Sequence, residues 1–348
     1  MCCYVDDISI GVSDVSLVDM FMSELRERFD VGDDQGKPVD WLLGMAITQD
    51  LKAGTIHMNM EMMIKKLAEG TLSEQELVRS ASVLTPMLVE PLLKQSERSV
   101  SKEVFDYLSV VGSLLHICNC VRCDVSYAVG VLARHATTPG LAHVKAAKRV
   151  VMYLYNTRTM GITYRRTEES KQSGPVLFEG TKHPLDDGTN RLQTFADSDY
   201  AGSETRRSTM GMVFMLNGGP VSWCSVLGKT VALSTCEAEV NAACLAAKEA
   251  LHLSQLLKDI GYNEEVKPLQ IAEDNAACIA QVSGGLRHVR KAKHYEVKLA
   301  FLQQLVVEEK IGFVYCPTEK QYADLFTKSL EKEKFIHFRN LIFGIDRV

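Results

Sequence analysis

The residues R-L-Q-T-F-A-D-S-D-Y, numbered 191–200, open the stretch that decides the fold of the second half of this chain. Residues 192–196 have the composition of a strand, and the acidic side chain of Asp197 follows at the end of that run. Two further apolar runs, at 209–216 and 221–225, are separated by N-G-G-P, which is typical of a tight turn. The stretch therefore predicts a meander of strands that carries an aspartate.

A long helix is predicted directly after this meander. A third short run, at 230–233, leads to Ser234 and Thr235, either of which is suited to cap the start of the helix. The sequence then continues C-E-A-E-V-N-A-A-C-L-A-A, which has a strong helix-forming composition.

The two glutamates of this helix are predicted to face different ways. Residues three and four apart share a helix face, and the face of Glu237 continues through the polar Asn241, which predicts exposure to solvent. The face of Glu239 continues through Ala243 and Ala250, which predicts that Glu239 points into the protein. A buried carboxylate needs a cation or a proton. Two interpretations stay open here: a metal ligand, or a neutral glutamic acid at the edge of the core.

Further carboxylates occur at the boundaries of predicted elements downstream. Residues 269–272 predict a strand that ends just before Asp274, and a helix is predicted at 275–282. Residues 312–316 predict another strand, followed by P-T-E-K-Q-Y-A-D-L-F-T-K, in which Asp324 lies on a predicted helix. The succession of elements is β-β-β-α-β-α-α-β-α. The acidic residues that mark its element boundaries are, in chain order, Asp197, Glu239, Asp274 and Asp324.

These motifs, in this order, resemble the ribonuclease H domain of copia-type (Pseudoviridae) retrotransposon Pol polyproteins over residues 191–330. The matching segments are F-A-D-S-D-Y-A-G, R-R-S-T-M-G, G-G-P-V-S-W, A-L-S-T-C-E-A-E-V, E-D-N-A-A, K-H-Y-E and P-T-E-K-Q-Y-A-D-L-F-T-K. The resemblance implies an α/β (α+β) fold, in which a ribonuclease H-like mixed sheet is flanked by helices.

The resemblance also implies a chemistry. In the family the catalytic metal ligands are four carboxylates, which here would be Asp197, Glu239, Asp274 and Asp324. Two Mg²⁺ ions, with Mn²⁺ as an alternative, would be held roughly 4 Å apart and support endonucleolytic hydrolysis of the RNA strand of an RNA–DNA hybrid. Glu239 is preferred to Glu237, because E-V-N-A-A matches the helix pattern of the family and the facial pattern agrees. Asp199 lies on the same predicted strand as Asp197, but the family places catalysis on the first aspartate.

The start of the chain, M-C-C-Y-V-D-D-I-S-I-G, contains the paired acidic residues Asp6 and Asp7. On spacing alone, a hairpin with an acidic turn is the favoured interpretation. However, Y-V-D-D resembles the reverse transcriptase active-site box, and W-L-L-G-M-A-I, S-V-L-T-P-M-L and D-V-S-Y-A-V-G-V-L-A-R also resemble copia-type polymerase. The family's other metal-binding aspartate and its fingers precede this box. We therefore expect Asp6 and Asp7 to be a partial polymerase metal site and expect no DNA synthesis by this chain alone.

The resemblance gives a domain plan. Residues 1–166 would be a mostly helical partial reverse transcriptase, with the end of the palm, the thumb and the connection. The polar, turn-rich residues 167–190 would be a linker. Residues 191–330 would be the ribonuclease H-like domain, and 331–348 a C-terminal tail.

A basic run, R-H-V-R-K-A-K-H at 287–294, lies between the third and fourth carboxylates. For any single residue an exposed basic helix start explains the charge equally well, but a cluster beside an acidic site favours contact with duplex phosphates. The residues predicted to bind nucleic acid are Arg206, Arg207, Arg287, Arg290, Lys291, Lys293 and His294. His294 matches the K-H of the family motif, whereas Ala300 stands where relatives commonly have a second histidine.

The composition is that of an ordinary globular protein, with 46% hydrophobic and 24% charged residues among 348. The formal net charge of −5 means that a nucleic-acid surface must be local. Ten cysteines without a secreted-domain framework, and no evident signal peptide or long apolar span, predict an intracellular setting, either cytoplasmic in a virus-like particle or nuclear. The expected partners are the hybrid duplex and the remainder of a Pol polyprotein, with no membrane.

Two other interpretations of the whole chain remain. It could be a catalytically silent retroelement relic that binds nucleic acid. It could also be the C-terminal piece of a longer active reverse transcriptase.

Overall fold

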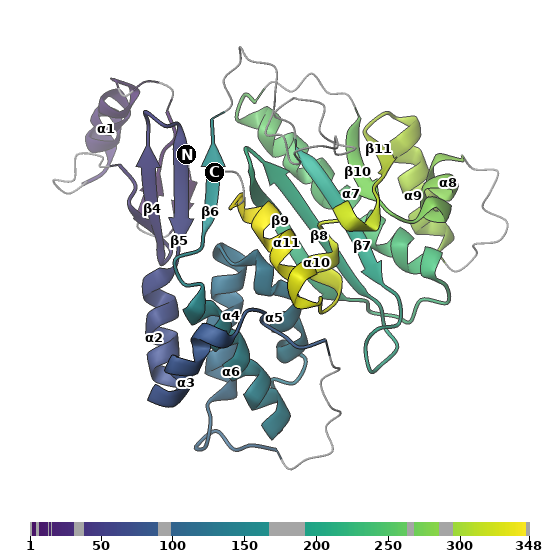
Figure 1. Ribbon diagram of the computed structural model, residues 1–348. Coiled ribbons are helices and arrows are strands. Elements are labelled where there is room, and N and C mark those ends of the chain that lie inside the picture. The colour runs from purple at the N-terminus through teal and green to yellow at the C-terminus, as the bar shows by residue number, and fades with distance from the viewer. Residues whose placement is uncertain are drawn as a thin grey trace.

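The protein is a mixed α/β structure in which a helical region and two main sheets pack side by side (Figure 1). The computed structural model describes residues 2–4, 7–12, 14, 16–30, 38–89, 99–166, 192–262, 268–284 and 295–345. The predicted linker at 167–190 and the basic run at 287–294 lie outside these residues. Within the described ranges, no helix combines the length and the apolar character needed to cross a membrane.

The second half is built on a five-stranded sheet. Its strands are β7 (Gln193–Asp199), β8 (Thr209–Leu216), β9 (Gly219–Leu227), β10 (Leu269–Glu273) and β11 (Ile311–Tyr315). The spatial order is β11-β10-β7-β8-β9; β7, β8 and β9 are antiparallel, and β10 and β11 run parallel to β7. The predicted turn is confirmed and tighter than expected, since Asn217 and Gly218 alone join β8 to β9 with φ of 52° and 81°. Residues 230–233 form no strand and connect β9 to the next helix.

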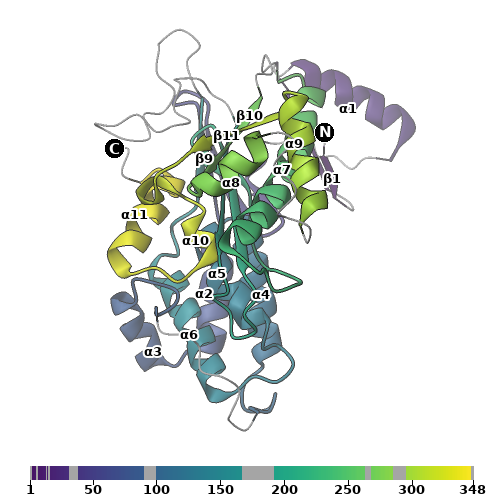
Figure 2. The same ribbon diagram turned by 90° about the vertical axis from the view of Figure 1, so that its right-hand side faces the viewer.

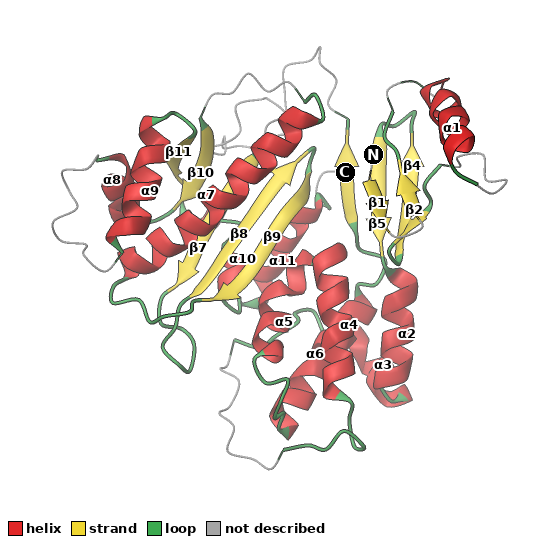
Figure 3. Ribbon diagram, turned by 180° about the vertical axis from the view of Figure 1, so that it is seen from behind, coloured by secondary structure: helices red, strands yellow, loops and turns green. Residues whose placement is uncertain are grey.

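Helices cover both faces of this sheet (Figures 2 and 3). One layer holds α7 (Thr235–Asp259), α8 (Ala276–Ser283) and α9 (Glu296–Val307), and the other holds α10 (Asp324–Thr327) and α11 (Lys332–Phe343). Strand alternation explains the two layers: Ala196 and Phe214 pack into the α7 side, whereas Phe195 and Val213 pack into the α11 side. All four side chains are fully buried.

The first half contains a second sheet besides its helices. The helices are α1 (Ser16–Arg28), α2 (Glu61–Thr71), α3 (Glu74–Arg79), α4 (Tyr107–Cys120), α5 (Ser126–Ala133) and α6 (Leu141–Asn156). The strands β3 (Trp41–Leu42), β4 (Met45–Asp50), β5 (Thr55–Asn59) and β6 (Ile162–Arg165) form an antiparallel sheet in chain order. At the start of the chain, β1 (Cys2–Tyr4) and β2 (Asp7–Ser9) pair as an antiparallel hairpin.

The two halves share one hydrophobic core. Leu114 of α4 and Val150 of α6 belong to the same buried cluster as Phe195 of β7 and Phe338 of α11. The indole Nε1 of Trp223 in β9 donates a hydrogen bond to the carbonyl oxygen of Cys118 in α4, at 3.1 Å. The five-stranded sheet is therefore held against the helical region by packing and by this hydrogen bond.

The segment 331–348, set apart in the sequence analysis as a tail, contains helix α11. Its Phe335, Phe338 and Ile342 are buried, and the ring of Phe335 meets that of Tyr153 from α6 edge-on at 5.6 Å. Helix α11 thus packs between the sheet and the helical region.

Candidate metal centre

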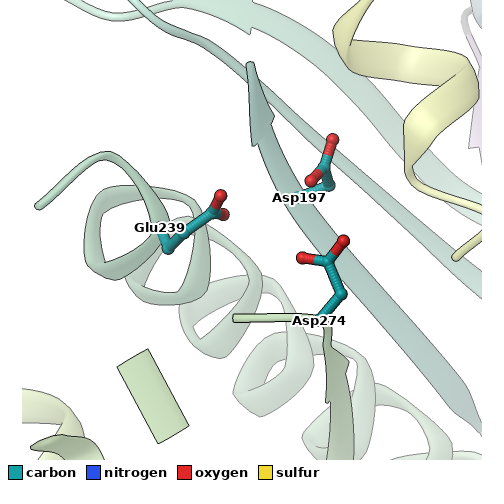
Figure 4. Close-up of side chains that lie close together, drawn as sticks. All are labelled: Asp197, Glu239 and Asp274. Atoms are coloured by element: carbon teal, nitrogen blue, oxygen red, sulfur yellow. The ribbon is translucent and has the colours of Figure 1, made fainter. Parts of the chain in front are cut away.

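Three carboxylates from separate elements converge at one place. Asp197 lies in β7, Glu239 in α7 and Asp274 just after β10, and one ligand oxygen from each lies within 4.8 Å of the others. Figure 4 shows the three side chains pointing toward one another. The register accounts for two of them: β7 and β10 are parallel with Ala272 opposite Phe195, so two residues further on Asp274 is level with Asp197.

Helix α7 brings Glu239 to this place, and the way it starts corrects one prediction. Of the two predicted candidates, Ser234 is the N-cap, and its hydroxyl accepts a hydrogen bond from the backbone N–H of Glu237 at 3.1 Å. The carboxylate of Glu237 in turn accepts from the backbone N–H of Leu233 at 2.7 Å. Glu237 is thus 7% exposed, and the prediction that it faces solvent is wrong, because the unpaired N–H groups at a helix start recruit nearby carboxylates.

Glu239 points into the protein, as the alanine-rich face predicted. It is 6% exposed, and its Oε2 has no hydrogen-bond partner among the described residues. Burial, followed by the neighbouring charge of Glu273, raises the pKa of Glu239 to about 11. Burial likewise raises the pKa of Asp197 to about 7, although the ammonium group of Lys328 acts in the opposite direction. Without a cation, Glu239 and Asp197 therefore keep their protons to a higher pH than ordinary carboxyl groups do.

Another buried carboxylate near this group, that of Glu273, was not predicted from the sequence. It is the last residue of β10, it is fully buried, and its Oε1 accepts a hydrogen bond from the N–H of Asn275 at 3.0 Å. Burial raises the pKa of Glu273 well above its usual range. The available signal was a glutamate that ends the apolar run L-Q-I-A directly before Asp274.

A single connecting segment, residues 318–328, touches both aspartates. The hydroxyl of Thr318 donates to Oδ2 of Asp274 at 3.0 Å, and the hydroxyl of Thr327 donates to Oδ2 of Asp197 at 2.5 Å. These contacts fix the rotation of each carboxylate.

The buried amide of Gln321 anchors the same segment. Its Nε2 donates to the carbonyl oxygens of Ala196 at 3.0 Å and Ala272 at 3.3 Å, so it bridges β7 and β10 beside the acidic group. Next to it, the ring of Tyr322 stacks on Phe195 with centroids 4.4 Å apart. The motif P-T-E-K-Q-Y-A-D-L-F-T-K therefore positions the site through several side chains besides its aspartate.

That aspartate, Asp324, is paired with lysines. Its side chain is 0% exposed; Nζ of Lys328 lies 2.6 Å from Oδ1, and Nζ of Lys334 from α11 lies 2.6 Å from Oδ2. In the part of the chain that the structure describes, the convergent group is Asp197, Glu239 and Asp274, without Asp324. The spacing of Lys328, four residues after Asp324, was a local signal for this pair, whereas Lys334 comes from another helix.

The other predicted site residues are placed as follows. Arg206 and Arg207 lie in the connection from β7 to β8; Arg206 is exposed, and Nε of Arg207 donates to the hydroxyl of Thr205 at 3.0 Å. Asp7 begins β2 opposite Tyr4, and Asp6 lies outside the described residues. The remaining basic residues also fall outside them: Arg287, Arg290, Lys291, Lys293 and His294.

The donor set fits a hard divalent cation. All three convergent side chains offer carboxylate oxygens, which Mg²⁺ and Mn²⁺ prefer. The buried Glu239 oxygen without a hydrogen-bond partner is the kind of group that a cation would satisfy. The site can therefore hold a divalent metal ion.

Comparison with known proteins finds retrotransposon Pol polyproteins among the relatives of this chain. Over 97% of its length the chain is 29% identical to the retrovirus-related Pol polyprotein from transposon TNT 1-94 of Nicotiana tabacum. Over its whole length it is 28% identical to the corresponding polyprotein from transposon RE1 of Arabidopsis thaliana. The chain is a homologue of copia-type retrotransposon Pol polyproteins. It spans 24% and 22% of these two polyproteins.

No family model matches the Pol homologue. Among solved structures, LC11-RNase H1 in complex with an RNA/DNA hybrid is 18% identical, with a TM-score of 0.31, over 39% of this chain and 94% of its own. The ribonuclease H-like fold of the Pol homologue is seen in the strand order and direction of the five-stranded sheet, three antiparallel strands followed by two parallel ones.

A glycine opposite Asp197 allows α10 to approach the sheet. Gly211 pairs with Asp197 across β7 and β8, and a Cβ added there would lie 2.7 Å from Cγ2 of Thr327 and 2.8 Å from Cβ of Phe326. Gly211→Ala is expected to lower the free energy of unfolding by about 1–3 kcal/mol, because α10 must move away from β8. Urea unfolding followed by circular dichroism measures this change.

The control is Gly112→Ala in the middle of α4. A Cβ added at Gly112 meets nothing within 4 Å, so the substitution is expected to stabilise the protein by roughly 0.5–1 kcal/mol through helix propensity. Equal effects of the two substitutions would contradict the close approach of α10 to Gly211.

The raised pKa of Glu239 predicts how the stability of the metal-free protein depends on pH. Because the folded-state pKa of about 11 exceeds the usual 4.5, stability from this group is full below pH 4.5 and is lost as the pH rises toward 11. Glu239→Gln removes this loss. In EDTA at pH 8 the variant is expected to be more stable than the wild type by on the order of 2–4 kcal/mol, with little difference at pH 4.5.

Urea unfolding at both pH values tests this expectation. The exposed Glu296 at the start of α9 provides the control, because Glu296→Gln is expected to change stability by less than about 0.5 kcal/mol at either pH. A Glu239→Gln variant that is no more stable than the wild type at pH 8 would show that water already solvates Glu239.

Proposed function

We propose that this Pol homologue is a ribonuclease H that hydrolyses the RNA strand of RNA–DNA hybrids with Mg²⁺ as cofactor. The observation that carries the proposal is the convergence of Asp197, Glu239 and Asp274, with a buried Glu239 oxygen that accepts no hydrogen bond from any residue that the structure describes. Such a cluster, on a ribonuclease H-like sheet in a homologue of Pol polyproteins, suits phosphodiester hydrolysis.

In this proposal the three carboxylates hold the cofactor, and Mn²⁺ is an alternative to Mg²⁺. When bound, two such ions would stabilise charge on the attacking and leaving oxygens of the phosphate. Thr318 and Thr327 hold the carboxylates of Asp274 and Asp197 in fixed rotations, so the ligand oxygens are placed before the metal arrives. Asp324 would join the set as a fourth ligand once a lysine contact is released.

The proposed substrate contacts come from two segments of the sequence. Arg206 and Arg207 follow β7, which carries Asp197, and the basic run at 287–294 follows α8 in the chain. Their positive charge would neutralise backbone phosphates and give salt-dependent binding, while contacts to the 2′-hydroxyl would distinguish RNA from DNA. Because the chain spans about a quarter of the relatives it matches, the rest of a Pol polyprotein is a further proposed partner.

The test is cleavage of an end-labelled RNA–DNA hybrid by the full chain, beside single-stranded RNA and double-stranded DNA of the same sequence. Cleavage of the RNA strand in the hybrid alone, present with Mg²⁺ or Mn²⁺ and lost in EDTA, is expected. Hybrid binding without cleavage would favour the silent nucleic-acid-binding relic instead. Equal cleavage of single-stranded RNA would overturn the hybrid specificity.

A further inference from the structure

The lysine pair on Asp324 is a feature that the proposed chemistry does not use. Asp324 is completely buried beneath two ammonium groups, each 2.6 Å from a different carboxylate oxygen. Both lysine side chains are 37% exposed, so each can turn toward solvent without unfolding the protein. Each carboxylate oxygen of Asp324 therefore has a lysine ammonium beside it, on the side from which another cation would approach.

The two lysines differ in what else they face. Lys328 directly follows α10 as its C-cap, next to the Thr327 that donates to Asp197. Its partial burial lowers its pKa, but the carboxylates of Asp197 and Asp324 raise it above the usual value, with a smaller contribution from Asp199. The ammonium of Lys334 lies over the ring of Phe338, 5.4 Å from its centroid. Lys328 is thus the lysine whose charge acts on both Asp324 and the convergent group.

A cation in this position has two opposite effects. It offsets the mutual repulsion of closely spaced carboxylates, whose interaction at a few ångströms is strong away from bulk water. It also repels a divalent ion that approaches Asp197, and it blocks the Asp324 oxygen that such an ion would use. Lys328 therefore stabilises the metal-free protein and weakens the binding of a divalent ion.

We propose that Lys328 is a resident countercharge of the acidic group, which stabilises the metal-free fold and competes with divalent metal for Asp324 and Asp197. The inference rests on the proposed function, because it takes the convergent carboxylates to be the metal site. Metal binding then requires the Lys328 ammonium to leave Asp324. Lys334 remains on the other oxygen and keeps Asp324 oriented.

The experiment compares the wild type with Lys328→Met, Lys334→Met and Lys332→Met. Lys332 is an exposed lysine at the start of α11, so its loss changes the net charge equally without touching Asp324. Calorimetric titration with Mg²⁺ and Mn²⁺ measures affinity, and thermal unfolding in EDTA and in saturating Mg²⁺ measures stability. None of these readouts depends on cleavage.

Lys328→Met is expected to lower the half-saturating metal concentration about tenfold, since one nearby positive charge is removed from a divalent site. In EDTA it is expected to melt below the wild type, and saturating Mg²⁺ is expected to restore most of the difference. Lys332→Met should match the wild type, and Lys334→Met should change the affinity by less than about threefold, because Lys328 stays in place.

Other results would contradict either the competition by Lys328 or the metal centre itself. Unchanged or weaker metal binding by Lys328→Met, in a chain whose wild type binds metal, overturns the competition and leaves the proposed function standing. Absence of metal binding by the wild type overturns the proposed metal centre itself. If Lys328→Met does not fold even with Mg²⁺, the Lys328→Arg variant tests the proposal instead. Because this variant retains the positive charge, its metal affinity should stay within about twofold of that of the wild type. A tenfold gain in its metal affinity would overturn the proposal.

Discussion

Replacing Asp274 by Asn is expected to lower the rate of hybrid cleavage by at least about a thousandfold, with little change in hybrid binding. Asn keeps the size of the side chain and one oxygen that can accept the hydrogen bond from Thr318. It removes the negative charge that attracts a divalent ion to the convergent group. A metal site contributes several kcal/mol of transition-state stabilisation, and each 1.4 kcal/mol is about tenfold in rate.

Single-turnover cleavage and filter binding of the same labelled hybrid separate the two effects. Asp199→Asn is the matched control, since Asp199 ends the same strand as Asp197 but lies outside the convergent group. Its expected rate loss is less than about tenfold, the scale of a nearby surface charge. Wild-type cleavage by Asp274→Asn would mean that the site is elsewhere, and a loss of binding without a loss in rate would make Asp274 a substrate contact.

The second large effect is expected far from the acidic group, at Arg122 in the helical region. The guanidinium of Arg122 and the carboxylate of Asp124 are both 0% exposed and form a two-point pair at 2.9 and 2.8 Å. Arg122 also donates to the carbonyl and hydroxyl oxygens of Thr157, and the hydroxyl of Tyr153 donates to Asp124. Arg122→Ala is expected to cost about 3–5 kcal/mol, because Asp124 is left buried without its cation.

Guanidinium chloride unfolding followed by circular dichroism measures this loss. Arg158→Ala is the control: its ion pair with Glu61 is longer, at 3.5 Å, and a third exposed, so its expected cost is below about 1 kcal/mol. A cost below about 1 kcal/mol for Arg122→Ala would show that water replaces the guanidinium around Asp124.

The effect of Arg122 should also reach the second half. Tyr153, which joins the Arg122 network, packs edge-on against Phe335 of α11, and α11 carries Lys334 on Asp324. We therefore expect Arg122→Ala to reduce hybrid cleavage together with stability. Metal-dependent activity that survives in an Arg122→Ala chain with an unfolded helical region would show that the two halves fold independently.

Much of the ribonuclease H-like half could be predicted because its signals are local. Apolar runs of strand-like composition predicted β7, β8 and β9, and the sequence N-G-G-P at 217–220 predicted the turn between β8 and β9, since positive φ is tolerated by few residues. Helical periodicity placed Glu239 toward the interior, and a hydroxyl before the helix predicted its cap at Ser234. Strand formation, turns, helix caps and the facing of a helix residue depend on residues that are close neighbours in the sequence, so they can be predicted from the sequence.

Local sequence patterns gave the wrong expectation where the outcome depended on hydrogen-bond partners of the backbone. Glu237 has polar neighbours at helical spacing and was predicted to face solvent, yet it caps the start of α7. Residues 230–233 have strand composition, yet they have no neighbouring strand to pair with and form a connection. Strand propensity has effect only where another strand edge is available.

By itself, then, the sequence determined the order of the strands and helices, the turn after β8 and the inward direction of Glu239. Only the tertiary structure decided which charges meet. Asp197 receives its hydrogen bond from Thr327, 130 residues later, and Asp324 is shared by lysines from two helices. The physical reason is that an ion pair depends on distance in space and on exclusion of water, and both are set by the packing of elements that are remote in the chain.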